Sequence, residues 1–253
     1  MKKTTRKLVT ILLLVSIAVL SISTFGTLAS LTIKSDEMRA QFEMYHTGIT
    51  LNENGKKLAW RDYQNEKWNE SGEAELLSDI KGDIRFGVIY PEELTVTNSG
   101  QIDEYVRVTI YKYWKNENGE KDQSLDNDLI NIRFTDDKTW VIDKEYSEDV
   151  ERTVMYYTKP LMGTDSKKGG ETTPAFITEV SLDPKIKLYV TQKEVKDEET
   201  GYITVTNTYK YDGKELCVEV QADAVQTHNA EDAIKSAWGR KVSIADDGTL
   251  SLE

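Results

Sequence analysis

The chain has 253 residues, enough for one large domain or two small ones and for a sizeable hydrophobic core. It carries 32 Lys and Arg against 44 Asp and Glu, a net charge of -12. Nucleic acid is therefore not an expected partner, because phosphate binding needs a basic surface. One cysteine and two histidines exclude an intramolecular disulfide and a zinc site built only from Cys and His of one chain.

The amino-terminal segment has the composition of an export signal. Basic residues precede an apolar run at 8–20, and small residues end the segment at Ala29. This pattern predicts a signal peptide at residues 1–29, cut by a signal peptidase between Ala29 and Ser30. The alternative is an uncleaved membrane anchor, because residues 8–29 could just span a bilayer. Cleavage would leave a secreted chain that is still more acidic than the full sequence.

Residues 30–253 are rich in segments that alternate apolar and polar residues, which is typical of β-strands. The clearest strand is at 105–113, where Val106, Val108 and Ile110 share one face. A short strand at 94–100 ends in turn residues that predict a hairpin or a crossing between sheets. Further strands are predicted at 42–51, 83–90, 129–134, 147–157, 176–182 and 187–191. Segments 164–173 and 193–201 are expected to be polar loops.

Two elements near the carboxyl end have sharper signals. Asp212-Gly213 predicts a tight hairpin between strands at 202–211 and 216–224, because this dipeptide tolerates positive φ angles. In the second strand, alternate apolar residues from Leu216 to Ala224 are expected to face the core. A helix is predicted to be capped by Asn229 and to end at Gly239.

These elements predict a mainly β fold, a jelly-roll-like antiparallel β-sandwich with one or a few short helices. Residues 58–78 give a weaker signal, for a helix or an irregular insertion. We expect a single domain at 30–253, with a mobile amino-terminal segment at 30–40. The length of the chain fits this organisation.

Patterns typical of catalysis are weak. Neither His46 nor His228 lies in the His-Glu-x-x-His motif of metalloproteases. Cys217 has no neighbouring histidine and is expected to be a small strand residue rather than a nucleophile. No catalytic residue, cofactor or metal site is therefore predicted.

Two groups of residues leave alternatives open. Acidic residues could supply oxygen ligands to calcium, although a solvated acidic loop is the simpler interpretation. Aromatic residues could form an outward stripe that binds carbohydrate, or could pack under a loop or a second sheet. The acidic residues are Asp122, Asp126, Asp128, Asp136 and Asp137, and the aromatic residues are Tyr105, Tyr111, Tyr113 and Trp114.

Four segments have a characteristic sequence: the end of the leader at 26–29, residues 41–55, the valine-rich unit at 96–110, and residues 222–226 followed by Ala237-Trp238. Together they resemble the TasA/camelysin family of exported Gram-positive proteins. Members of this family are typically processed by a signal peptidase of the SipW type, and they assemble into fibres at the cell surface or in the biofilm matrix. The resemblance implies a secreted jelly-roll-like sandwich that associates with itself and with other matrix or cell-surface proteins. The sequence departs from the family pattern after the cleavage point, where the usual aromatic and acidic residues are replaced by Ser30-Leu31-Thr32-Ile33.

Residues 30–38 are a candidate donor strand. Leu31 and Ile33 alternate with Thr32, and cleavage would free the segment to pair with an open sheet edge of a neighbouring molecule. A disordered tail is the alternative. The expected function is that of an extracellular structural protein, a subunit of biofilm fibres assembled by strand addition, and not of an enzyme. A surface adhesin or carbohydrate-binding module is the second expectation, and a metalloprotease, a label that camelysin-like members carry, is the third.

Overall fold

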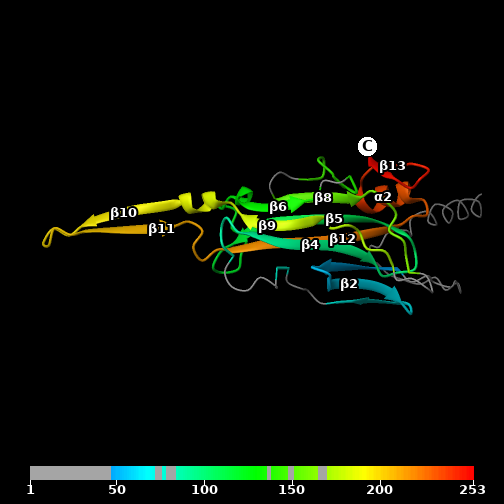
Figure 1. Cartoon of the computed structure of the whole chain (residues 1–253), viewed down its shortest axis with the longest axis horizontal. Coiled ribbons are helices and arrows are strands. Elements are labelled where there is room, and N and C mark those ends of the chain that lie inside the picture. Colours follow the sequence, from blue (N-terminus) through cyan, green and yellow to red (C-terminus); the bar gives the residue numbers. More distant parts are fainter. Residues whose placement is uncertain (1–46, 72–75, 78–83, 136–137, 148–150, 165–169) are drawn as a thin grey trace, which may run out of the picture.

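The computed structural model describes residues 47–71, 76–77, 84–135, 138–147, 151–164 and 170–253. Two antiparallel sheets face each other in a sandwich (Figure 1). One sheet contains, in spatial order, β3 (Lys67–Glu70), β2 (Lys56–Gln64), β1 (Thr47–Glu53), β4 (Ile89–Asn98), β9 (Ile177–Leu182) and β6 (Ile130–Phe134). The other contains β12 (Glu215–Gln226), β5 (Glu104–Lys115), β8 (Arg152–Tyr157) and β7 (Trp140–Ile142). The prediction of a mainly β, sandwich-like fold is confirmed.

Apolar side chains of both sheets fill the space between them. In β5, Val106, Val108 and Ile110 are almost fully buried, which confirms the face predicted from their alternation. Leu94 and Val96 of β4 meet them from the opposite sheet. The alternate apolar residues of β12 also pack against this core, as expected from the sequence.

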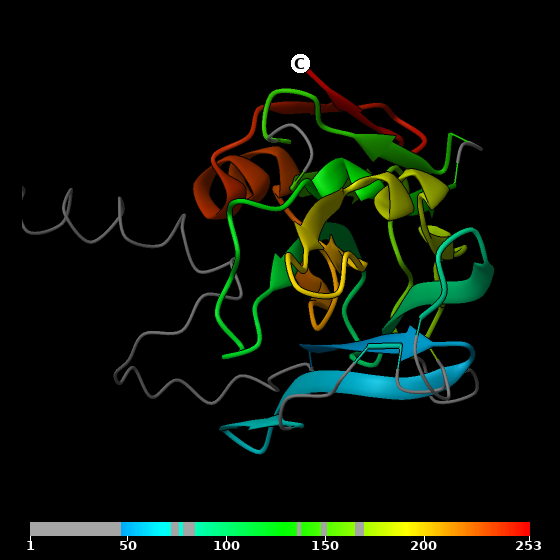
Figure 2. The ribbon, with the colours of Figure 1, turned by 90° about the vertical axis from the view of Figure 1, so that its left-hand side faces the viewer.

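The outer face of the second sheet is covered as well. Helix α2 (Ala230–Trp238) and the small hairpin of β13 (Val242–Ile244) and β14 (Leu250–Leu252) lie over it, on the far side from β1 and β2 (Figure 2). The ring of Trp238 packs against that of Tyr156, with ring centroids 5.5 Å apart. This third layer gives β5 a buried residue on both of its faces.

The predicted helix ends where expected. Gly239 has a φ of 70°, a conformation that costs glycine little, and its N–H donates to the carbonyl of Lys235. Asn229 holds the N-cap position, but its side chain makes no capping hydrogen bond. The negative charges of Glu231 and Asp232, in the first turn, stabilise the helix by interacting with the positive end of its dipole.

A buried amide fixes the crossing from the first sheet to the second. Asn98 at the end of β4 donates through Nδ2 to the carbonyls of Ile102 and Leu161, at 2.7 and 2.9 Å. Its Oδ1 accepts from the N–H of Gly100 at 2.9 Å. Because an unpaired buried amide is costly, these bonds favour this path of the chain over others. The turn after β4 is therefore a crossing between the two sheets and not a hairpin.

Four local predictions are wrong. Residues 58–78 contain most of β2 and all of β3 instead of a helix or an irregular insertion. A single strand, β4, stands where two strands, at 83–90 and at 94–100, were predicted. The expected loop at 193–201 contains the end of β10 (Val190–Lys196). The Asp212-Gly213 turn exists, with a φ of 69° at Gly213, but it joins strands that do not pair with each other.

The pairing of β12 has a physical reason. Its 12 residues pair with the 12 residues of β5 along their full length, and this buries the apolar face of β12 in the core. The strand β11 (Ile203–Tyr209) has only 7 residues and pairs with β10 instead. A hairpin of β11 and β12 would have left the apolar face of β12 without this cover.

Several sequence-based predictions lie outside the described residues. These are the signal peptide, its cleavage site at Ala29 and Ser30, the donor candidates Leu31, Thr32 and Ile33, and the segment 30–40. In the part of the chain that the structure covers, no helix combines the length and the apolar character needed to cross a membrane.

Candidate functional site: a projecting hairpin

Strands β10 and β11 form a two-stranded hairpin that extends well beyond the sandwich, at the end opposite α2 (Figure 1). They pair along 7 residues, from Val190 opposite Tyr209 to Lys196 opposite Ile203. Every residue of both strands is exposed. An isolated two-stranded hairpin is marginally stable in water, so its attachment to the sandwich and its free edges decide what it can do.

An aromatic base, formed by Trp114, Tyr189 and Tyr211, attaches the hairpin to the sandwich. The ring centroid of Tyr211 lies 5.0 Å from that of Trp114 and 5.4 Å from that of Tyr189. The Trp114 indole N–H donates to the carbonyl of Asp126, and the Tyr211 hydroxyl oxygen accepts from the N–H of the same residue, both at 3.0 Å. Edge-to-face rings and these bonds hold the two ends of the hairpin against one point of the body.

The entry to β10 is anchored in the same place. A short 3-10 helix, η2 (Pro184–Leu188), precedes the strand, and the Asp183 side chain caps it by accepting from the N–H of Lys185 at 2.8 Å. Ile186 in this helix is buried in a cluster with Trp114. Both strands of the hairpin therefore join the sandwich at packed, hydrogen-bonded positions.

The hairpin exposes a group of apolar side chains on one face. The register puts Val190, Ile203, Val205 and Tyr209 on the same face, since side chains alternate along a strand. Their exposed fractions are 41, 60, 46 and 50%. Single exposed apolar residues are common on protein surfaces, whereas a group on one projecting element marks a contact surface.

Within the described residues, one side of the β11 backbone has hydrogen-bonding groups that pair with no strand. The N–H of Asp197 donates to the carbonyl of Tyr202, and the N–H of Lys210 donates to that of Tyr189. Because hydrogen-bonded pairs alternate along an antiparallel ladder, alternate residues of β11 direct N–H and C=O away from β10. These outward residues are Ile203, Val205, Asn207 and Tyr209. Among the described residues, this sheet has no third strand to pair with them.

The tip of the hairpin is a well-formed turn. The Asp197 carboxylate accepts from the backbone N–H groups of Thr200 and Glu199, at 3.0 and 2.9 Å. These bonds hold the pKa of Asp197 below its usual value. Gly201 has a φ of 72°, which side chains disfavour. The turn therefore fixes the register of the two strands.

A pocket of about 520 Å³ opens on the side of the sandwich between β5, β6 and β8. Its lining combines apolar, polar and charged side chains, those of Ile110, Lys112, Asp128, Ile132, Phe134, Glu151 and Thr153. Burial lowers the pKa of Lys112, whose ammonium donates to the carbonyl of Ile130 at 2.7 Å. The charged group of Lys112 is thus already engaged with the protein.

Two of the four residues that could have formed an aromatic stripe on β5 are packed inside the molecule. Tyr105 and Trp114 are both 2% exposed and lie on opposite faces of the strand. Tyr105 donates from its hydroxyl to the carbonyl of Gly248 at 2.8 Å, under the third layer. Trp114 belongs to the aromatic base. Tyr105 and Trp114 are therefore packing residues and not part of an exposed stripe that could bind carbohydrate.

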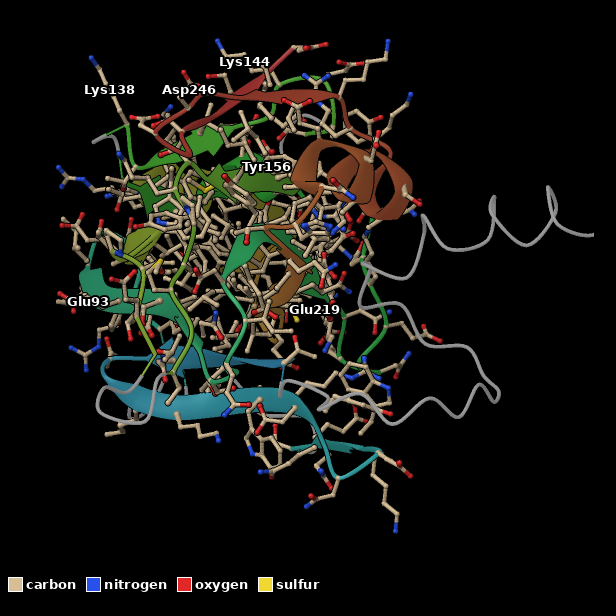
Figure 3. The ribbon with its side chains drawn as sticks, turned by 90° about the vertical axis from the view of Figure 1, so that its right-hand side faces the viewer. Glu93, Lys138, Lys144, Tyr156, Glu219 and Asp246 are labelled. Carbon is tan, nitrogen blue, oxygen red and sulfur yellow. The ribbon has the colours of Figure 1, made fainter. Side chains whose placement is uncertain are left out.

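The other residues singled out in the sequence do not form a reaction centre in the described part of the chain. His228 lies in the turn before α2. Cys217 is half-buried on β12, with Sγ 4.0 Å from the carboxylate of the exposed Glu219, which Figure 3 labels. His46, Asp136 and Asp137 are outside the described residues.

The acidic residues after β5 are engaged in local bonds. Asp122 accepts from the N–H and the hydroxyl of Ser124 and lies 3.6 Å from the Lys214 ammonium. The bonds with Ser124, more than Lys214, hold the pKa of Asp122 below its usual value. Asp126 caps a second 3-10 helix, η1 (Asn127–Leu129). Over the residues that the structure covers, no three His, Cys, Asp or Glu side chains gather as metal ligands would.

The sequence patterns did not point to the buried titratable groups, among them Tyr156 and Glu104. Burial raises the pKa of Tyr156 to about 12, and this side chain is packed beside α2, away from the marginal Lys138 and Asp246 (Figure 3). Burial also raises the pKa of Glu104 to about 7, against a smaller lowering by the hydroxyl of Thr47, which donates to its Oε1. Glu104 opens β5, where its backbone exchanges two hydrogen bonds with Leu161. A shifted pKa is a mark of functional sites, but ordinary core positions show it too.

Glu104→Gln tests the burial of this carboxyl. The folded protein holds the Glu104 proton up to about pH 7, whereas an unfolded carboxyl releases it near pH 4.5. The free energy of unfolding should therefore fall as the pH rises through this window, by up to about 3 kcal/mol from this group. Gln has no proton to release. Denaturant unfolding should show the variant gaining stability relative to wild type between pH 4 and pH 8, and a difference that does not change with pH would contradict the assignment.

Tyr211→Ala tests the aromatic base. The substitution removes two ring contacts and one hydrogen bond, so the free energy of unfolding should fall by about 1–3 kcal/mol. Amide exchange should become faster in β10 and β11. Tyr202→Ala is the matched control, because Tyr202 is at the tip and 76% exposed. It should change stability by less than about 0.5 kcal/mol, and equal effects of the two substitutions would contradict an anchoring role.

Comparison of the chain with family models, with curated proteins and with solved structures finds no match. Function is therefore inferred from the hairpin, the sheet edges and the sequence itself.

Proposed function

We propose that the protein is a secreted structural protein of the cell surface or extracellular matrix, whose copies assemble into fibres by strand addition. The observation that carries this proposal is the projecting hairpin, with its exposed apolar face and with backbone groups of β11 that pair with no strand of the described chain. Such an edge gains hydrogen bonds and buries apolar surface when another strand pairs with it.

The sheet edges of the sandwich support assembly into a chain of molecules. In the described structure, β3 and β6 end one sheet, and β12 and β7 end the other. Each molecule thus has the projecting hairpin of β10 and β11, called the arm from here on, and separate open sheet edges. Contacts between two different surfaces can repeat without closing, which is the geometry of a fibre.

The amino-terminal sequence supports secretion. The basic start, the apolar run and the small residues before Ser30 are those of an export signal. The resemblance to the TasA/camelysin family supports a place in the matrix, and Leu31, Thr32 and Ile33 stay candidates for a donor strand.

A surface adhesin is the second candidate, and the hairpin favours it too. Tyr202 at the tip is 76% exposed and Leu188 at the base is 71% exposed. Tyrosine is common where proteins bind partners, because its ring is apolar and its hydroxyl is polar. In an adhesin these side chains would contact a different protein instead of a second copy.

Negative-stain microscopy of the purified secreted chain at rising concentration tests the proposal, with its first residue determined by mass spectrometry. We expect a first residue near Ser30 and fibres that grow with concentration. Replacement of residues 190–209 by a short glycine linker should abolish or greatly slow their growth. A deletion of residues 30–38 measures the donor-strand contribution separately. Monomers at every concentration, or a chain that stays in the cell, would contradict the proposal.

A further inference from the structure

The two outer edges of the hairpin differ in charge. The edge strand β10 carries Lys193, Glu194 and Lys196, whereas the 7 residues of β11 include no charged residue, no glycine and no proline. Charged side chains, lysine above all, protect an edge against pairing with another chain. An uncharged strand rich in β-branched residues invites such pairing. The open edge of β11 is therefore the unprotected one.

We propose that β11 pairs with β11 of a second copy of this chain, so that two hairpins form one four-stranded antiparallel sheet about a two-fold axis at Thr206. This inference rests on the proposed self-association of the protein and names its contact. The pairing is isologous, because the same strand contributes from both molecules. It is a dimer contact, to which the other sheet edges add in a longer assembly.

The backbone geometry fits this register. Pairing centred on Thr206 puts Ile203 opposite Tyr209 of the second copy, and Val205 opposite Asn207. These are the residues whose N–H and C=O groups point away from β10. Each outward N–H then faces an outward C=O, and all 7 residues of the strand are paired.

The side chains fit it as well. On one face, Ile203 lies beside Tyr209 of the second copy, and that tyrosine already faces Val190 of its own hairpin. On the other face, Thr204 lies beside Thr208, and Thr206 lies beside its own copy. Pairs of an aromatic and a β-branched residue, and pairs of threonines, stabilise neighbouring strands.

The same arrangement is unfavourable for β10. A two-fold axis at its centre would place Lys193 directly opposite Lys193 of the second copy, and like charges in that position destabilise a sheet. Thr204, Thr206 and Thr208 lie symmetrically about the centre of β11, and this symmetry is the reason to assign a second copy as the partner. A foreign strand would require no such symmetry.

Charge and shape are compatible with two molecules meeting in this way. The register brings the acidic tip, with Asp197, Glu198 and Glu199, near Lys210 of the second copy, because Tyr202 falls opposite that lysine. The hairpin projects away from its sandwich (Figure 1). Antiparallel pairing therefore puts the two sandwiches at opposite ends of a shared sheet about 24 Å long, estimated from the rise per residue.

Thr206→Glu tests the pairing. Within its own hairpin the new carboxylate lies opposite Lys193, a favourable pair that preserves the fold of the arm. In the dimer, two carboxylates meet at the two-fold axis. Sedimentation equilibrium should show a dimer for wild type and a dissociation constant at least about fivefold higher for the variant.

A matched control and a charge exchange locate the contact. Thr191→Glu places the same charge on the same face of the hairpin, but on β10, and should leave the dissociation constant unchanged. The double variant Lys193→Glu with Thr206→Lys reverses the pair inside the hairpin and should also associate weakly alone. Mixed with Thr206→Glu, it should restore the dimer, because opposite charges then meet at the axis.

Three results would overturn the inference. They are a wild-type chain that is monomeric at every concentration, a Thr206→Glu variant that associates as well as wild type, and a Thr191→Glu variant that is equally impaired. Circular dichroism of each variant shows whether the sandwich is intact. Fibres that form normally from Thr206→Glu would remove this contact and leave the proposed function standing, whereas the absence of all association would remove both.

Discussion

The pairing of β5 with β12 is the constraint on which the rest of the structure depends. These two strands are the longest in the described chain, and they match residue for residue over their whole length. Their inner faces build the core between the sheets, and the outer face of β5 supports α2. The same pairing takes β12 away from β11, its neighbour in sequence. As a consequence, β11 has β10 on one side and no strand of the described chain on the other.

The aromatic base turns this arrangement into an arm. A free two-stranded hairpin would be marginal, but Trp114 and Tyr211 tie its ends to a buried cluster at the end of the sandwich. The arm is therefore held in place while its strands stay exposed. The packed core is in the sandwich and the proposed contact surface is in the hairpin, a division found where a rigid scaffold presents a binding element.

The sequence was sufficient to predict the strands and helices that bury one face and expose the other. The alternation in β5 and the apolar positions of α2 gave their bounds within one or two residues, because burial on one side imposes a period. Asp212-Gly213 correctly predicted a turn, but the expected pairing of the strands on either side of it was wrong. Strand pairing depends on contacts with residues far away in the sequence.

The hairpin itself could not be found in this way. Its strands are exposed on both faces, so β10 has no hydrophobic period, and its charged end at Lys193 and Lys196 is typical of a loop. Trp114, read in the sequence as part of an aromatic stripe, is a member of the aromatic base. The sequence pattern of a single strand does not show which distant residues its aromatic side chains contact.

The most direct measurement of the central claim is amide exchange in β11 at low and high protein concentration. The N–H groups of Ile203, Val205, Asn207 and Tyr209 point away from β10, and those of Thr204, Thr206 and Thr208 are bonded to it. If β11 pairs between copies, the first set exchanges rapidly in dilute protein and becomes protected as concentration rises, while the second set is protected throughout. Exchange of the first set that is equally fast at every concentration would contradict this pairing.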